Sequence, residues 1–331
     1  MLKTALIGVG GIANTYRRSL SNLGQSIVAV VDSNLRDATR VGQEEEAEIF
    51  HDYRKMLAEV GPDVVIACLP PGDHTTQVKE ATEFGCAVFV SRPVALNPGV
   101  AVNTRDAIAT ANIINQVGYV GRYSDGIAKA KQLLAGRKIT MANCRLAFRM
   151  NAGHPWWGDG NRSGGQLVEQ TTHIFDTLRY LLGEVAQMQA WGVNNVSATG
   201  IADFEECVTC NMRFTSGAIA SVSSTCVASA DEGMVIELIA DDACLRITND
   251  LVVSGIIAGK PVIYQGIERG YFRQMKSFYE AVDKHKQDMV LCDYADGVKT
   301  LAVTLAANVA MRHNQVVQVT KQDEQQVSAV A

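Results

Sequence analysis

The sequence predicts an α/β protein in two parts. These are a doubly wound parallel sheet over residues 1–121 and an α/β domain with an open, mostly antiparallel sheet over residues 122–331. Near-continuous apolar runs alternate with helical segments in the first third, which is typical of a parallel sheet buried on both faces. A glycine-rich turn directly follows the first of these runs. Between residues 185 and 265, strand-like runs are separated by short turns, which indicates an antiparallel sheet with one face on its helices.

Length, composition and charge restrict the class of protein. A chain of 331 residues suits about two domains, and 47% hydrophobic with 20% charged residues is ordinary globular usage. The formal net charge is -5 and no basic block occurs, so we expect no nucleic-acid or membrane partner. No apolar run reaches about 18 residues, and the N-terminus shows no secretory cleavage site. Eight scattered cysteines fit a reduced, cytoplasmic compartment.

The first part is expected to alternate strands and helices. Apolar runs predict strands at residues 2–8, 26–32, 63–70, 86–90 and 114–120. The stretches between them predict helices at residues 11–23, 53–60, 73–85 and 97–112. Because such an alternation builds one parallel sheet covered on both faces, this part is predicted to be a Rossmann domain.

The glycine-rich turn "GVGGIA" fits G-x-G-x-x-A between the first strand and the first helix. Gly8 allows the tight turn, Gly10 lets the backbone approach a pyrophosphate, and Ala13 keeps the helix close to the sheet. Asp32 ends the second strand and suits the ribose hydroxyls, so NAD is the expected cofactor, while Arg36 leaves NADP open. A turn that holds no ligand is the alternative. The cofactor-binding candidates here are Gly8, Gly10, Gly11, Ile12, Ala13, Asp32 and Ser33.

Further candidates follow the other strands, because ligands of such sheets bind at the carboxyl ends of the strands. These candidates are Leu69, Pro70, His74, Ser91, Arg92 and Arg122. Alternatively, the proline only stops a strand, His74 caps its helix, and Arg92 forms a surface salt bridge. Pro93 is expected to give a cis bond or a tight turn that aims residue 92 into the crevice.

Four motifs give the chain a family resemblance: "GVGGIA", "ACLPPGDH", "GCAVFVSRPVALN" and "GYVGRYSDG". They come in the order and spacing of the glucose–fructose oxidoreductase, inositol dehydrogenase and rhizopine-catabolism (Gfo/Idh/MocA) family, which the chain resembles over nearly its whole length. The resemblance implies an N-terminal Rossmann domain and a C-terminal α/β domain on an open sheet. It also implies the oxidation or reduction of sugars, inositols and related polyols with NAD(P).

The chain departs from this family at residues 91–93, where similar members carry Glu-Lys-Pro and this chain has Ser-Arg-Pro. The resemblance implies that the family's lysine binds substrate, touches the cofactor and often joins the proton relay. Arginine has a pKa above about 12, so Arg92 cannot shuttle a proton, although it can stabilise a developing alkoxide. Proton transfer would then fall on His173, or the enzyme would favour anionic substrates such as sugar acids.

The second part is expected to open with a helix, a strand and a loop, at residues 124–136, 138–150 and 151–165. A loop of this length without evident structure is usually functional. Trp156 and Trp157 suit stacking on the apolar face of a sugar, or they fill a domain junction. His154 has the same two interpretations. The substrate-binding candidates are therefore Arg122, His154 and Trp157.

A helix expected at residues 166–183 carries the remaining catalytic candidates. Glu169 and His173 lie opposite its apolar stripe as an i, i+4 pair, although a solvated helix face is the alternative. The pattern "GGQLVEQTTHIFDTLRYLLGE" resembles the catalytic helix of the family. This implies that His173 faces the nicotinamide and takes the substrate proton, while Glu169 contacts substrate or orients the histidine. An unperturbed imidazole pKa of about 6.5 suits that task.

The rest of the chain is expected to form the antiparallel sheet, helices at residues 270–285 and 294–311, and a fraying tail, "KQDEQQVSAVA". Cys207 and Cys210 form C-x-x-C, but residues i and i+3 of a strand point to opposite faces, and no second ligand pair follows. We therefore expect no metal site. An open sheet face needs a cover, which predicts a homodimer or homotetramer.

These features predict an NAD(P)-dependent oxidoreductase that transfers hydride between the nicotinamide and a sugar, inositol or sugar-acid hydroxyl. Its catalytic residues would be His173, Arg92 and Glu169. The departure at residues 91–93 leaves two alternatives open. One is an NAD-dependent glycoside hydrolase or lyase that oxidises its substrate transiently. The other is a non-catalytic homologue that binds NAD or a sugar.

Overall fold

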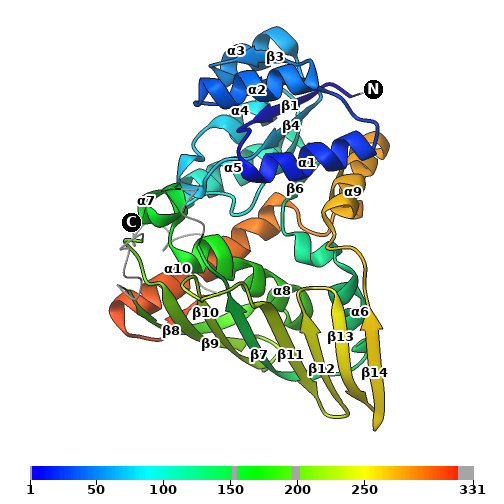
Figure 1. The fold of residues 1–331 in the computed structure, drawn as a ribbon, viewed down its shortest axis with the longest axis vertical. Helices are drawn as coiled ribbons and strands as arrows, with labels where there is room; N and C mark the ends of the chain where they lie inside the picture. Colours follow the sequence, from blue (N-terminus) through cyan, green and yellow to red (C-terminus); the bar gives the residue numbers. More distant parts are fainter. Residues whose placement is uncertain (1, 151–154, 195–201, 320–331) are drawn as a thin grey trace. The chain divides into compact units, whose positions relative to one another are not determined.

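A computed structural model describes residues 2–150, 155–194 and 202–319, and the chain divides into two compact units (Figure 1). The first unit contains Met1–Tyr119 and Tyr271–Val298, and the second contains Val120–Gly270 and Lys299–Ala331. The sequence assigns everything after residue 121 to the second domain, so the structure differs by returning residues 271–298 to the first unit. His154 and the tail "KQDEQQVSAVA" lie outside the described residues.

A parallel sheet forms the centre of the first unit. Its six described strands run in the order β3-β2-β1-β4-β5-β6, and every neighbouring pair is parallel. The strands are β1 (Thr4–Ile7), β2 (Ile27–Val31), β3 (Glu48–Phe50), β4 (Val64–Ala67), β5 (Ala87–Val90) and β6 (Asn115–Val117). The order reverses between β1 and β4, and ligands of doubly wound sheets bind at such a point.

The helices and short turns of this unit are α1 (Gly11–Asn22), α2 (Leu35–Glu45), α3 (Tyr53–Val60), η1 (Pro71–Asp73), α4 (Gln77–Glu83), α5 (Pro98–Ala111), α9 (Tyr271–Lys284) and η5 (Gln287–Met289). The sequence predicts no element over the stretch that forms α2 and β3. Asn34 begins α2, because its side chain accepts hydrogen bonds from the backbone N–H groups of Arg36 and Asp37.

Helix α9 belongs to the first unit because it shares a hydrophobic core with α1 and the sheet (Figure 1). Phe89 of β5 lies between Tyr16 of α1 and Phe278 of α9, with ring centroids 4.9 and 5.6 Å apart. Thr4 Oγ1 and Tyr279 Oη form a buried hydrogen bond of 2.6 Å. Burial of this face of α9 therefore ties a distant part of the sequence to β1.

A second sheet organises the other unit. Its nine described strands follow the order β14-β13-β12-β11-β7-β10-β9-β8-β15, and neighbours are antiparallel except for β7 and β10. The strands are β7 (Ile139–Ala147), β8 (Val185–Val193), β9 (Cys207–Phe214), β10 (Ile219–Thr225), β11 (Gly233–Ala240), β12 (Ala243–Thr248), β13 (Val252–Ile257), β14 (Lys260–Gln265) and β15 (Val317–Gln318). The predicted mostly antiparallel sheet is confirmed.

Helices cover one face of this sheet (Figure 1). The helices and turns are η2 (Val120–Tyr123), α6 (Asp125–Leu133), η3 (Pro155–Gly158), α7 (Gly160–Ser163), the π-helical segment η4 (Leu167–Thr171), α8 (Thr172–Leu182) and α10 (Tyr294–His313). The division between the units falls within α10. The helix expected at residues 166–183 is thus a π-helical segment followed by an α-helix.

Side chains alternate across the second sheet. In β9, Cys210 is buried and Cys207 is partly exposed, as expected for strand positions i and i+3. In β10, Ala220 and Val222 belong to the core, whereas Ile219 is 47% exposed on the other face. One face of the sheet is therefore packed on helices and the other remains open.

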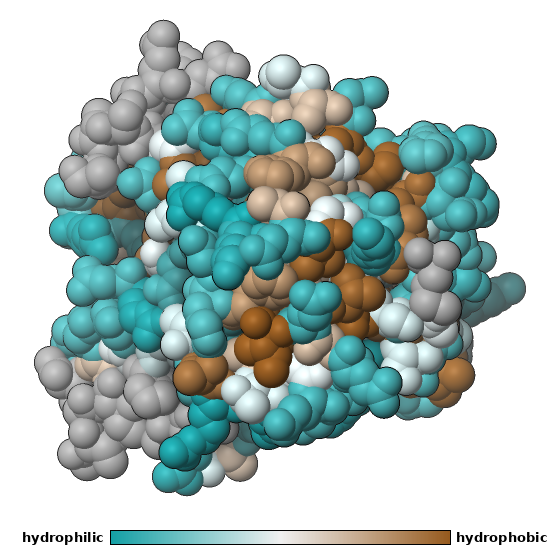
Figure 2. Space-filling model, turned by 90° about the horizontal axis from the view of Figure 1, so that it is seen from above, coloured by the Kyte–Doolittle hydropathy of each residue, from teal (hydrophilic) through white to brown (hydrophobic). Residues whose placement is uncertain are grey.

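The described helices include none that is long and apolar enough to cross a membrane. Exposed hydrophobic side chains do occur, among them Leu35 and Phe84 in the first unit. On the face drawn in Figure 2, hydrophobic residues form a band between hydrophilic ones.

Candidate functional site

The glycine-rich turn joins β1 to α1 and leaves room for a ligand. Gly8 has a φ of +85°, and a Cβ there would lie 2.3 Å from the carbonyl oxygen of Cys68, so only glycine fits. Above Gly10 the space is open, since no atom lies within 4 Å of a Cβ built there. Gly10 is also the N-cap of α1, whose first turn has neither a side-chain cap nor an acidic residue.

The backbone N–H groups of this helix start, at Gly11 and Ile12, suit the pyrophosphate of a dinucleotide. Ala13 is fully buried, so the helix lies close to the sheet as the motif requires. The residues of the turn therefore fit the expected cofactor.

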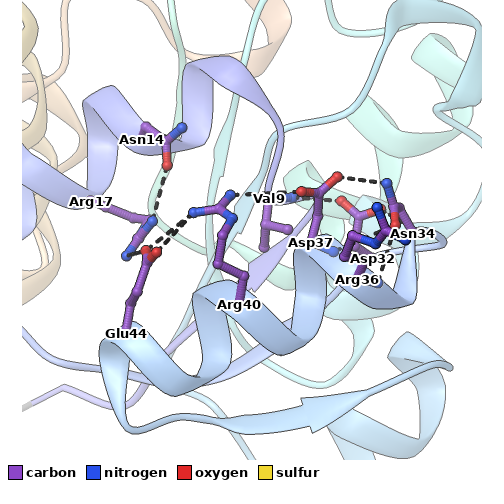
Figure 3. A network of polar contacts seen from close by, with 9 residues as sticks. All are labelled: Val9, Asn14, Arg17, Asp32, Asn34, Arg36, Asp37, Arg40 and Glu44. Carbon is purple, nitrogen blue, oxygen red and sulfur yellow. Dashed lines mark hydrogen bonds and ion pairs between the residues drawn. The ribbon is translucent and has the colours of Figure 1, made fainter.

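Asp32 directly follows β2 and is fixed beside the same turn (Figure 3). Its Oδ2 accepts a hydrogen bond from the backbone N–H of Val9 at 2.8 Å, and its Oδ1 accepts one from Asn34 at 2.8 Å. Each carboxylate oxygen has a second lone pair, which suits a ribose hydroxyl. Ser33 is exposed directly after it.

The end of β4 meets the glycine turn. A Cβ on Gly8 would lie 3.2 Å from Cδ2 of Leu69, which is followed by Pro70. His74 does not cap α4, because that helix begins after Thr76 and no side chain caps it. The His74 side chain is 4% exposed, and burial lowers its pKa to about 4, an effect that the Leu69 carbonyl partly opposes. This burial favours a structural role for His74, in packing near the end of β4, over direct contact with the cofactor.

Ser91 and Arg92 follow β5 and lie against the end of β6. The backbone N–H of Ser91 donates to the carbonyl of Ala67 at 2.8 Å. The Arg92–Pro93 peptide bond is cis, which was one of the two conformations expected for Pro93. A Cβ on Gly118 would lie 3.3 Å from Cα of Ser91 and 3.4 Å from the backbone nitrogen of Arg92. The turn at residues 91–92 is thus closely packed.

Tyr16 is a neighbour of this turn that is not among the candidates predicted from the sequence. Its hydroxyl oxygen would lie 2.7 Å from a Cβ on Gly118, and its ring is fully buried. Burial raises the pKa of Tyr16, and the positive charge of Arg92 opposes that rise. In the sequence, only an aromatic residue in the first predicted helix, Tyr16, and a glycine in the last predicted strand, Gly118, hint at this contact.

Glu169 and His173 lie at the start of the catalytic-helix candidate in the second unit. Glu169 falls in the π-helical segment η4 and is 6% exposed, so a solvated helix face does not describe it. His173 is the second residue of α8 and is half-buried. A π-helical segment within a helix is frequent at functional sites.

Polar contacts to β10 hold the π-helical segment at both ends. Gln166 Nε2 and Thr171 Oγ1 both donate to Ser224 Oγ, at 2.6 and 3.0 Å. All three side chains are buried. None of the three is among the residues predicted from the sequence. A polar residue at an inward-facing strand position, such as Ser224, is a signal that points to them.

Arg122 forms a buried ion pair with Asp176 within the second unit. Its Nε and Nη2 donate to the two carboxylate oxygens of Asp176 at 2.8 and 2.6 Å, and Thr300 Oγ1 donates to Oδ1 of Asp176 at 2.9 Å. Arg122 is 5% exposed and Asp176 1%. Burial raises the pKa of Asp176, and the Arg122 charge opposes this. The pairing argues against Arg122 as a substrate ligand and favours a structural role.

The described part of the loop after β7 has more structure than the sequence suggests. Trp156 and Trp157 lie in η3, both half-buried, with ring centroids 5.9 Å apart in a T-shaped contact. The backbone N–H of Gly160 donates to Oδ1 of Asp203 at 2.6 Å, and Asp159 caps α7. The loop is therefore tied to the segment before β9.

Two family models match the chain. One, described as "Oxidoreductase family, NAD-binding Rossmann fold", matches residues 2–119. The other, described as "GFO/IDH/MocA C-terminal domain", matches residues 127–246. Their order corresponds to the two sheets described above.

Curated relatives include dehydrogenases of polyols and glycosides. The chain is 26% identical over 230 residues to scyllo-inositol 2-dehydrogenase (NAD(+)) of Bacillus subtilis (strain 168), covering 68% of this chain and 67% of that protein. It is 27% identical over 192 residues to D-glucoside 3-dehydrogenase of Escherichia coli (strain K12), covering 55% of this chain and 54% of the relative. The matches span between about half and two thirds of these relatives.

Solved structures share the fold at low sequence identity. Levoglucosan dehydrogenase in complex with NADH and levoglucosan has a TM-score of 0.86 at 18% identity, covering 96% of this chain and 99% of that one. An oxidoreductase from Agrobacterium radiobacter, in complex with NAD+, L-tartaric acid and magnesium, has a TM-score of 0.88 at 18% identity, with 97% and 99% covered. These likenesses confirm the predicted fold class.

Proposed function

Because the chain belongs to the Gfo/Idh/MocA oxidoreductase family, we propose that it transfers hydride between NAD and the hydroxyl-bearing carbon of a sugar, inositol or sugar acid. The glycine turn carries this proposal, since Gly10 faces open space at an uncapped helix start and Asp32 lies beside it. The prediction of NAD as cofactor is confirmed by the family model, which describes an NAD-binding fold. The inositol and glucoside dehydrogenases among the relatives support the substrate class.

The proposed catalytic residues are His173, Glu169 and Arg92. Bound NAD would accept the hydride from the substrate carbon. His173 would take the hydroxyl proton, for which an imidazole is suited near neutral pH. Glu169, one turn earlier and buried, would orient His173 or contact the substrate. Trp157 would contact the sugar through its apolar ring face.

Arg92 would stabilise negative charge on the reacting oxygen or on an anionic substrate. A guanidinium holds its proton at every working pH, so it acts by charge and hydrogen bonding and not as a base. The closely packed turn at residues 91–92 supports this role, because it fixes the backbone from which the Arg92 side chain extends.

A spectrophotometric screen of sugars, inositols and sugar acids with NAD and NADP, at several pH values, tests the proposal. NADH formation with a polyol or sugar supports it. Cleavage of a glycoside without net NADH would instead identify a hydrolase or lyase with transient oxidation. A rise in melting temperature with NAD, but no turnover of any compound, would identify a binding homologue.

The role of His173 has its own test. Replacing His173 with alanine should lower kcat by about 10²–10⁴-fold, the usual contribution of a general base, while NADH binding stays unchanged. The matched control is His313→Ala, since His313 is exposed at the end of α10. A His173→Ala variant that turned over the best substrate at nearly the wild-type rate would contradict the assignment.

We also propose that the open face of the second sheet is covered by another copy of the chain, in a homodimer or homotetramer. Trp191 of β8 is 44% exposed on this face and Ile219 of β10 is 47% exposed. A reduced, cytoplasmic compartment is part of the same proposal. It is supported by the cysteines, all eight of which lie among the described residues and are free thiols.

A further inference from the structure

A chain of polar contacts borders the ribose end of the proposed NAD site (Figure 3). It begins at Asp32, whose Oδ1 accepts a hydrogen bond from the backbone N–H of Asn34 at 2.8 Å. The Asn34 side chain caps α2, and its Nδ2 donates to Oδ2 of Asp37 at 2.6 Å. The network thus starts at the residue assigned to the ribose hydroxyls and passes onto helix α2.

On α2 the network continues through Arg40. Its Nη2 lies 3.8 Å from Oδ1 of Asp37, and its Nη1 donates to Oε1 of Glu44 at 3.0 Å. Glu44 also accepts from Nη2 of Arg17 on α1 at 2.8 Å, and Glu45 accepts from Nε of Arg17 at 2.6 Å. Both guanidinium groups are therefore paired with carboxylates.

Stability is a poor explanation for the Arg40–Glu44 pair. The two side chains are 47% and 45% exposed, and ion pairs this exposed contribute little to the free energy of unfolding. Their position is more informative. Arg36 and Arg40 lie one turn apart on α2, just after Asp32, and an arginine in this region is what accommodates the 2′-phosphate of NADP in Rossmann domains.

We propose that Asp37 and Glu44 are positioning residues whose carboxylates lie beside Arg40, so that a 2′-phosphate bound there would meet negative charge. Together with Asp32 they select NAD against NADP. The reason is electrostatic, because a phosphate would have to displace a carboxylate from Arg40 and would lie near further negative charges. The inference rests on the proposed function, since it requires a dinucleotide at the glycine turn.

The test compares the binding of NADH and NADPH to the full chain, by fluorescence titration of the reduced nicotinamide without substrate. The double variant Asp37→Asn with Glu44→Gln removes two charges and keeps side-chain shape and acceptor oxygens. It should bind NADPH about tenfold more tightly than the wild type, or about 1.4 kcal/mol, with NADH affinity changed by less than about twofold. Adding Asp32→Ser should then reverse the preference.

The matched control is the double variant Glu59→Gln with Glu280→Gln, which also removes two negative charges from the first unit. Glu59 pairs with Lys55 and Glu280 with Lys276, both as exposed i, i+4 ion pairs. Its ratio of NADPH to NADH affinity should equal that of the wild type. An equal change in both double variants would overturn the inference while leaving the proposed function intact. A wild type that bound neither nucleotide would overturn both. If the double variant is unstable, the single variant Glu44→Gln replaces it in the test. Its NADPH affinity should also rise, by less than that of the double variant.

Discussion

Arg92 is the residue at which the resemblance leads us to expect a lysine, and the backbone around it is closely packed. The turn that bears it packs against Gly118 and lies near Tyr16. A Cβ on Gly118 would be too close to the Tyr16 hydroxyl, at 2.7 Å, and tight against Cα of Ser91, at 3.3 Å. The backbone that carries Arg92 is therefore closely packed at the end of β5. Because a guanidinium does not give up its proton, we propose His173 and not Arg92 for the proton transfer.

We expect His74 to make the free energy of unfolding depend on pH. Burial lowers its folded-state pKa to about 4, while an unfolded histidine titrates near 6.5. Above about pH 6.5 His74 is neutral in both the folded and the unfolded protein, so its contribution to the free energy of unfolding is fully present. As pH falls toward 4 the unfolded state binds a proton that the folded state does not, so this contribution is lost. The shift corresponds to roughly 3 kcal/mol.

Replacing His74 with glutamine should therefore reduce the loss of stability between pH 7 and pH 5. The measurement is the free energy of unfolding from urea denaturation at several pH values. His51→Gln is the matched control, because His51 is exposed in the same unit, and its pH profile should follow the wild type. Identical profiles for the wild type and His74→Gln would show that His74 does not carry the effect.

At the scale of elements, the helix with Glu169 and His173 is fixed from two sides within the second unit. Ser224 of β10 receives hydrogen bonds from both ends of the π-helical segment, and Asp176 of α8 pairs with Arg122. A regular α-helix over residues 166–183 would turn Glu169 and His173 by a different angle, because a π-helical turn contains an extra residue. These contacts determine how the helix presents its two polar side chains.

The ion pair beneath this helix can be tested by replacing Asp176 with alanine. The change removes the carboxylate that accepts two hydrogen bonds from the buried Arg122 guanidinium, and breaking a buried pair in this way costs about 3–5 kcal/mol in the free energy of unfolding. The control is Asp242→Ala, which breaks the Arg137–Asp242 pair at 2.7 Å, where the side chains are 27% and 40% exposed. That change should cost less than about 1 kcal/mol. Similar losses of stability in urea denaturation would contradict the distinction.

For the whole molecule, the open sheet face leads to a prediction about assembly. Light scattering should give a mass of two or four times the 35.7 kDa chain. Ile219→Glu places a charge in the middle of the proposed interface and should lower the mass to that of one chain or of a smaller assembly. Phe84→Glu, at a side chain that is 57% exposed in the first unit, is the control and should not change it. An unchanged mass for Ile219→Glu would place the interface elsewhere.

Local patterns made much of the fold predictable. Apolar runs, the glycine turn and Asp32 depend on neighbours within a few residues, so the parallel sheet and the cofactor turn follow from the sequence. Helix α2 and strand β3 were missed because their stretch is polar and carries no comparable run. The resemblance supplied the catalytic helix, but no local pattern reveals a π-helical segment within it.

The sequence by itself determined the two-part α/β architecture, the glycine turn for NAD, and the acid beside it, because each depends on periodicity or on turn residues close together in the chain. Only the tertiary structure decided that α9 belongs with β1, through contacts 275 residues apart, and that Arg122 pairs with Asp176, 54 residues away. It also decided that Arg40 is held by carboxylates on α2. Such partners are chosen by packing and charge in three dimensions, which no local pattern contains.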